Sequence, residues 1–247
     1  MFIKIKQEAV LLFSVKKTVL FLTGIILCTD VNLHSYVRNY NGANLCEFVI
    51  FFLTNKYNIL MLLTIMVAAV CSDKYGFYNR YVTLLRYKSR SEYYLVQLFV
   101  RVAYAFVCII IFVLIPVLYG KYRGLSGQEP VMFLQVSPMT VIWQSMNIMC
   151  YAFWICVLFA LFSIIVRNKI ADVLLIMGLP LINLMVVKAG IYWLAKWLPW
   201  QNIAFELYGW EISNYRLYWE YWLILISVFL YIGDSIFSNK DIVYENC

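Results

Sequence analysis

The chain has 247 residues, of which 64% are apolar or aromatic and only 13% are charged, and its mean hydropathy is +0.78. Soluble domains carry about a quarter charged residues, so this composition excludes a soluble globular protein and predicts helices that cross a membrane. The formal charge is +7. Basic residues beside apolar segments set topology and contact anionic lipid, so we expect membrane lipid as a neighbour and no nucleic-acid partner.

We predict an all-helical, polytopic membrane protein, with about six transmembrane helices forming one domain over residues 1–247. Residues 1–16 alternate basic and apolar side chains, which is typical of an amphipathic helix lying at the membrane interface. Each span needs roughly 20 mostly apolar residues to cross the hydrocarbon. The predicted spans cover about residues 17–37, 57–71, 94–118, 141–166, 173–194 and 219–237.

The second apolar region, Leu45 to Cys71, is interrupted by Asn55, Lys56 and Asn58. The piece from Cys46 to Thr54 is too short to cross the bilayer alone. It is therefore a re-entrant helix, an interfacial helix, or a part of span two, and the sequence leaves these three interpretations open.

Orientation follows from the distribution of Lys and Arg. Twelve of them lie in residues 1–17, in the segment after span two, in the turn after span four and in the C-terminal tail, whereas six lie on the opposite side. Because cytoplasmic loops carry the excess of basic residues, both termini are predicted to be cytoplasmic. The predicted location is the bacterial plasma membrane, as a multi-pass protein.

Enzymatic motifs are missing from the sequence. A zinc hydrolase needs several converging imidazoles or thiolates, and His34 is the single histidine. A phosphate loop needs Gly six residues before its Lys, yet Ile115 occupies that position before Gly120-Lys121. We therefore predict that the chain is not an enzyme and binds no cofactor of its own.

Charged side chains inside the predicted spans are costly unless they are paired or hydrated. Arg101 lies about two turns into its span, close enough to the cytoplasm for its side chain to reach the interface. Lys188 lies about fifteen residues into the span 173–194. It could reach the outer interface, pair with Glu47 or Glu206, or face a hydrated path. Lys188, Glu47 and Arg101 are the candidates for a path or an ion pair.

Aromatic residues gather in the segment before the last span. Six of the eight Trp lie between Trp193 and Trp222, which is the pattern of an interfacial aromatic belt. The same residues could form an outer gate or a surface for an apolar peptide.

The longest polar segment, residues 72–93, follows the second span. From Ser72 to Tyr94 it carries five cations and six Tyr, too many polar groups to enter lipid. On composition it is either a docking helix for a cytoplasmic partner or a basic anchor with Tyr at the headgroups.

The order of elements adds a resemblance. A basic amphipathic helix precedes span one, span two ends in Ser72-Asp73, and Leu84-Leu85-Arg86-x-x-Ser89-Arg90-x-x-Tyr93 leads into span three. The chain closes on Phe237-Ser238-Asn239-Lys240-Asp241-Ile242. Over nearly its whole length it resembles the permease subunits of ABC-2 type transporters, and most of all the small Gram-positive permeases of the phenol-soluble modulin and bacteriocin exporter type.

That resemblance implies a division of labour. A separate cytoplasmic ATPase subunit would hold ATP and Mg, and two permease chains, identical or homologous, would enclose the path for an amphipathic or hydrophobic peptide. Residues 77–90 map onto the coupling helix of the family, and the turn 167–172 onto a second contact. The ATPase-coupling residues would be Phe77, Tyr78, Arg80, Tyr81, Leu85, Arg86, Lys88, Arg90, Arg167 and Lys169.

Two rival functions remain open at this stage. A membrane immunity protein would bind an antimicrobial peptide at the outer surface and need no ATPase. An ion-coupled secondary transporter would be expected to carry inverted repeats or acidic residues on broken helices near the midplane, and neither feature is clear in the sequence.

Overall fold

The computed structural model describes residues 15–71, 90–127, 129, 136–165, 169–195, 197–200, 202 and 215–239. Most of the predicted interfacial helix 1–16, and residues 72–89 of the predicted coupling loop, lie outside these ranges. The helical fold class is confirmed, because every regular element of the described residues is a helix. The helices are α2 (Val15–Tyr40), α3 (Leu45–Thr54), α4 (Lys56–Cys71), α6 (Arg90–Tyr122), α7 (Pro138–Ile165), α8 (Lys169–Lys188), α9 (Tyr192–Ala195) and α10 (Tyr215–Asn239).

Three helical segments are long and apolar enough to cross a membrane, namely Thr18–Tyr40, Tyr94–Tyr122 and Pro138–Leu161. A fourth span arises if the bent pair Leu45–Thr54 and Lys56–Thr64 counts as one. Helices α8 and α10 fall where spans five and six were expected, but in the described residues neither meets the same test. The fold is therefore that of a helical protein with three or four candidate spans, and the predictions of six spans and of cytoplasmic termini stay predictions.

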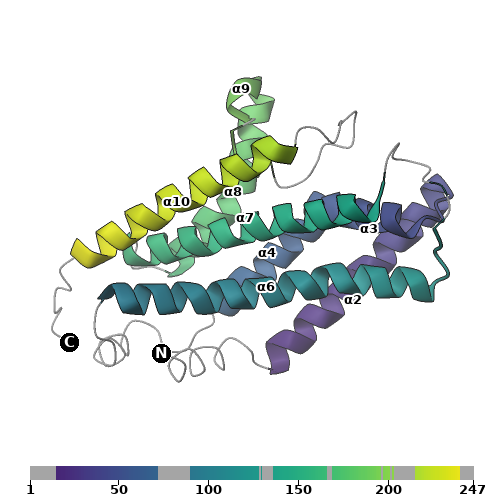
Figure 1. Cartoon of the computed structure of the whole chain (residues 1–247), viewed down its shortest axis with the longest axis horizontal. Coiled ribbons are helices and arrows are strands. Elements are labelled where there is room, and N and C mark those ends of the chain that lie inside the picture. The colour runs from purple at the N-terminus through teal and green to yellow at the C-terminus, as the bar shows by residue number, and fades with distance from the viewer. Residues whose placement is uncertain are drawn as a thin grey trace.

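Helix α7 lies at the centre of the arrangement. It packs against α6 on one side and α10 on the other, and these three helices run along the long axis of the molecule (Figure 1). Helix α3 fills the space among α2, α6 and α7, while α8 leaves this bundle and leads to the short α9.

The helix α3 is buried on all sides. Phe48, Val49, Phe52 and Leu53 have exposed fractions of 0–1%, and the ring of Phe52 lies 4.9 Å from that of Phe112 on α6, between centroids. An interfacial helix keeps one face in water. The packing of α3 therefore favours a re-entrant helix or one half of a broken span over the interfacial interpretation.

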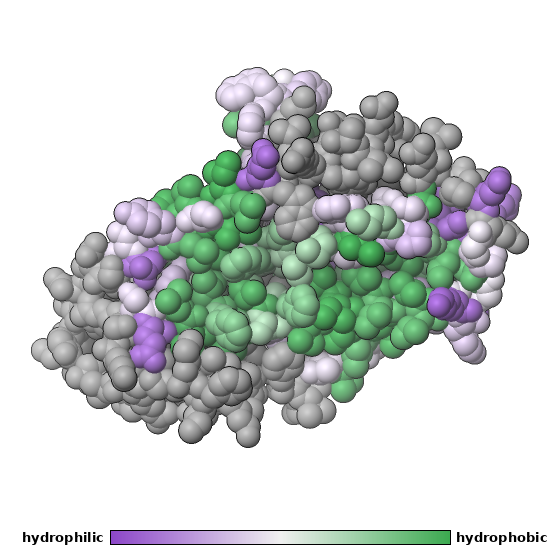
Figure 2. All heavy atoms as spheres, in the orientation of Figure 1, coloured by the Kyte–Doolittle hydropathy of each residue, from purple (hydrophilic) through white to green (hydrophobic). Residues whose placement is uncertain are grey.

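Apolar side chains cover the outside of the bundle as well as its core. Leu20, Leu27 and Val31 on α2, and Leu118 on α6, are more than half exposed, and Figure 2 shows a broad hydrophobic field across the middle of one face, with hydrophilic residues toward its ends. In water such a patch would be large for a monomer. It suits contact with lipid tails.

The ends of α2 and α6 are joined by backbone hydrogen bonds. The amide of Leu45 donates to the carbonyl of Ser126 at 2.9 Å, and the amide of Ser126 donates to the carbonyl of Ala43 at 2.9 Å. Gly124 ends the α6 turn with φ +83°, a conformation that glycine adopts without steric cost. The turn after α2 and the turn after α6 therefore form one cap.

A substitution at Gly42 tests how tightly this cap packs against the ring of Tyr36. A Cβ at Gly42 would overlap the ring of Tyr36, whereas a Cβ at the exposed Gly127 meets nothing within 4 Å. Overpacking a filled site costs about 1–3 kcal/mol, so G42A is expected to lower the melting temperature of the chain in detergent, and G127A to leave it unchanged. Thermal unfolding can be followed by the reaction of a fluorogenic thiol reagent with the buried Cys108 and Cys156. Equal melting of the two variants would contradict this packing.

Candidate functional site

Most of the predicted ATPase-coupling residues fall outside the described part of the chain. Arg90 is the first residue of α6 and Lys169 is the first residue of α8, and the structure describes the backbone but not the side chain of each. The predicted coupling residues outside the described ranges are Phe77, Tyr78, Arg80, Tyr81, Leu85, Arg86, Lys88 and Arg167.

Glu47 is a fully buried carboxylate in the first turn of α3. The Tyr36 hydroxyl donates a hydrogen bond of 2.6 Å to its Oε2. The backbone amide of Glu47 donates to Oδ1 of the N-cap residue Asn44 at 2.9 Å. Negative charge at a helix N-terminus is also favoured by the helix dipole. Glu47 thus fixes the corner between α2 and α3.

The break between α3 and α4 is the second buried polar feature. The two helices meet at 62°, so the carbonyls at the end of α3 lose their partners in the next turn. Asn58 Nδ2 donates to the Phe52 carbonyl at 2.9 Å, and Gln144 Nε2, from α7, donates to the Leu53 carbonyl at 3.3 Å. In hydrocarbon every backbone polar group needs a partner within the protein. These two amides supply it.

Three asparagines tie the same break to α2. Asn32 Nδ2 donates to the side chain of Asn58 at 3.1 Å and to the Cys28 carbonyl at 2.7 Å, and Asn55 Nδ2 donates to Asn32 Oδ1 at 3.0 Å. Sequence reasoning recognised Asn55 and Asn58 as an interruption but missed their role and that of Asn32. The signal that could have identified Asn32 is its position as a polar residue within an apolar run.

A second amide on α7 holds the segment that precedes α10. Asn147 Nδ2 donates to the Asn202 carbonyl at 2.7 Å, and Trp222 Nε1 donates to Asn147 Oδ1 at 2.7 Å. Residues three apart share one face of a helix. Gln144 and Asn147 therefore make α7 the common support of the broken α3–α4 pair and of the segment around Asn202.

The described Trp residues of the predicted aromatic belt divide into two groups. Trp193 and Trp197 are 71% and 68% exposed, as a belt requires. Trp200 and Trp222 are buried instead, and both rings pack against Tyr151 of α7, with centroids 6.0 and 5.8 Å from that of Tyr151. These two Trp are thus part of the helix packing. Composition could not separate the two groups, because both have the same residue type and neighbouring positions.

The remaining path or ion-pair candidates lie apart. Lys188 is exposed at the end of α8, and the structure does not bring it to Glu47, which is enclosed at the corner of α2 and α3. The predicted alternative partner Glu206 lies outside the described residues. The Arg101 guanidinium is partly buried and lies over the ring of Phe159 on α7, 5.4 Å from its centroid.

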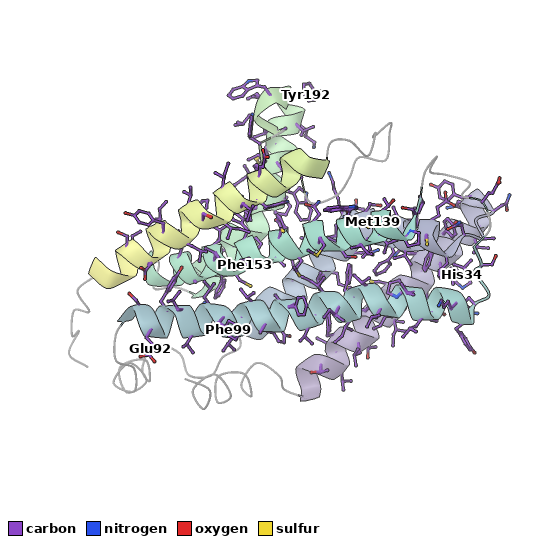
Figure 3. All side chains as sticks on the ribbon, in the orientation of Figure 1. His34, Glu92, Phe99, Met139, Phe153 and Tyr192 are labelled. Atoms are coloured by element: carbon purple, nitrogen blue, oxygen red, sulfur yellow. The ribbon has the colours of Figure 1, made fainter. Side chains whose placement is uncertain are left out.

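One ion pair joins α2 and α6 at the end of the bundle that carries His34, opposite the end with Glu92 (Figure 3). Arg123 Nη2 lies 3.2 Å from Asp30 Oδ1, and the Tyr119 hydroxyl also donates to that oxygen. His34 Nε2 lies 3.9 Å from Asp30 Oδ2 and is largely exposed. His34 thus lies at the surface of the bundle.

No protein family, curated protein or solved structure matches this chain. An interpretation of its function therefore depends on the motifs of the sequence and on the contacts described above.

Gln144 provides a test of the break. In Q144L the Leu53 carbonyl loses its donor in an apolar interior, which costs about 1–3 kcal/mol. S145A is the matched control, because Ser145 Oγ only donates to the Val141 carbonyl of its own helix, at 2.7 Å. We expect a lower melting temperature in detergent for Q144L than for S145A, and faster hydrogen exchange around residues 50–58. Identical exchange in the two variants would show that Gln144 does not support the break.

Proposed function

We propose that this chain is the permease subunit of a bacterial ABC exporter of the ABC-2 type, coupled to a separate ATPase. The observation that carries the proposal is the basic, Tyr-rich segment between α4 and α6. Its pattern Leu84-Leu85-Arg86-x-x-Ser89-Arg90-x-x-Tyr93 resembles the coupling region of that family. The phosphate loop that this chain lacks would be supplied by the partner, which also holds ATP and Mg.

Two features of the fold support a transport role. Interrupted helices with internally satisfied backbone groups occur in transporters where the chain lines a cavity or changes its arrangement, and the α3–α4 pair is such an element. Its partners are neutral amides that can exchange hydrogen bonds at little cost in charge burial. A second permease chain, a copy or a homologue, completes the path in this proposal.

The proposed substrate is an amphipathic or hydrophobic peptide. Aromatic and aliphatic side chains dominate the chain, with 18% aromatic residues, and such a lining accepts apolar surface without offering charged groups that would retain it. Lys188, which is exposed at the end of α8, stays a candidate for a residue of the path.

Coupling in this proposal is a shift between two arrangements of the helices. Binding and hydrolysis of ATP change the contacts of the ATPase with residues 77–90 and 167–172, and a ligand shifts such an equilibrium by the difference in its affinity for the two states. The first turn of α6 follows directly after residue 89, so movement of the coupling segment reaches a long helix of the bundle without an intervening linker.

The decisive experiment is co-purification with the ATPase encoded beside this chain. We expect a stoichiometric complex with vanadate-sensitive ATP hydrolysis, and peptide export when it is reconstituted in vesicles. A chain that purifies alone and still protects cells from an added antimicrobial peptide would replace the proposal with the immunity function.

Charge reversal tests the coupling segment. R86E/R90E is expected to reduce ATP-driven export at least tenfold while membrane insertion is retained, because opposite charge is placed at the proposed ATPase contact. The matched control is R38E/K121E, which makes the same charge change at two exposed residues at the other end of the bundle. Full export by R86E/R90E at normal subunit stoichiometry would refute this role of the segment.

A further inference from the structure

Helix α6 begins and helix α10 ends at the same end of the bundle, on the left of Figure 1, and the two helices pack against each other. Each of them carries a charged residue, and the two charges are opposite. Arg101 belongs to α6 and Asp234 belongs to α10. An ionisable side chain at membrane depth is stable only when it is paired or hydrated. The contacts of each charged side chain therefore show whether it still needs a partner of opposite charge.

Each of the two charges lacks what the other can supply. Asp234 Oδ1 is buried and accepts no hydrogen bond from any residue that the structure describes. The guanidinium of Arg101 lies over the ring of Phe159, and among the described residues no carboxylate lies within 4.0 Å of it. Within the part of the chain that the structure describes, a buried carboxylate oxygen without a donor and a guanidinium without a carboxylate thus lie on adjacent helices.

Tyr94 connects the two charges. Its side chain is 4% exposed, and it lies on α6 seven residues, or about two turns, before Arg101, so the two residues share one face of the helix. Helix α10 approaches this hydroxyl at Gly233, where a Cβ would overlap the hydroxyl oxygen. The glycine therefore permits a close approach that brings Asp234 beside the Tyr94 side chain.

We propose that Arg101 and Asp234 form an electrostatic latch between α6 and α10, with Tyr94 as the hydroxyl between them. In the arrangement seen here the latch is open, because no ion pair joins Arg101 and Asp234 in the described residues. A small displacement of α6 against α10 brings the guanidinium to the carboxylate, and the direct ion pair then holds the two helix ends together. Phe159 of α7 holds the guanidinium in the open arrangement.

The latch gives the proposed function a point of regulation, and in this respect alone it rests on that function. Arg90, Tyr94 and Arg101 follow one another along α6 within about three helical turns. A force applied by an ATPase just before Arg90 would therefore reach the latch through continuous helix.

A double-mutant cycle on the full chain in detergent, without any ATPase, tests the latch. The melting temperatures of R101Q, D234N and R101Q/D234N are compared with that of the unaltered chain. A latch predicts that each single variant melts lower, by about 2–4 °C for a chain of this size, because the closed arrangement, in which the two charges pair, no longer stabilises the folded chain. The double variant should then melt close to the single variants, well above the temperature expected from adding the two losses.

Additive losses would overturn the latch, because two charges that act independently do not compensate each other. The matched control cycle combines R101Q with D30N, which removes the carboxylate that pairs with Arg123. The losses in melting temperature should be additive in this control. If a single variant fails to accumulate, the test is the charge-exchange variant R101E/D234K, and the yield of folded chain is measured. Recovery of the folded chain supports the latch, and failure of the exchange overturns it. A coupled cycle in a chain that binds no ATPase would keep the latch and remove the proposed function.

Discussion

The structure depends on one constraint, which is that a helix interrupted at membrane depth must find hydrogen-bond partners for its freed carbonyls inside the protein. At the end of α3 these partners are the side-chain amides of Asn58 and Gln144. Asn32 and Asn55 position Asn58 in turn. The 62° bend is therefore built into the sequence by amides on three helices, and α2, α4 and α7 must assemble around α3 before the break is satisfied.

The same constraint explains why α7 is central. Its side chains reach in two directions, since Gln144 supports the α3–α4 break while Asn147 supports Asn202 and accepts from Trp222. All of these groups are uncharged. Neutral amides satisfy backbone groups without the large cost of burying charge. The charged residues Glu47, Arg101 and Asp234 lie elsewhere in the bundle and do not support the break.

Much of the fold could be predicted from the sequence, because apolar runs of span length follow directly from composition. Helices α2, α6, α7 and α10 begin and end within a few residues of the predicted spans, whereas α8 ends at Lys188, before the predicted end at residue 194. The burial of α3 could not be predicted, because the six-residue apolar run Phe48–Leu53 is compatible with an interfacial position or with the core. The sequence also could not predict that Trp193 is exposed while Trp200 is buried, or that Lys188 lies apart from Glu47. Such contacts depend on how helices distant in sequence pack.

The cap that joins the turn after α2 to the turn after α6 has a mechanical consequence. Two backbone hydrogen bonds between Ala43–Leu45 and Ser126, together with the Asp30–Arg123 pair, join these two helices at that end. A tilt of α6 about this end is the motion that keeps all of these bonds. Because α6 is 33 residues long, a small tilt there moves the start of α6 much further than it moves the cap.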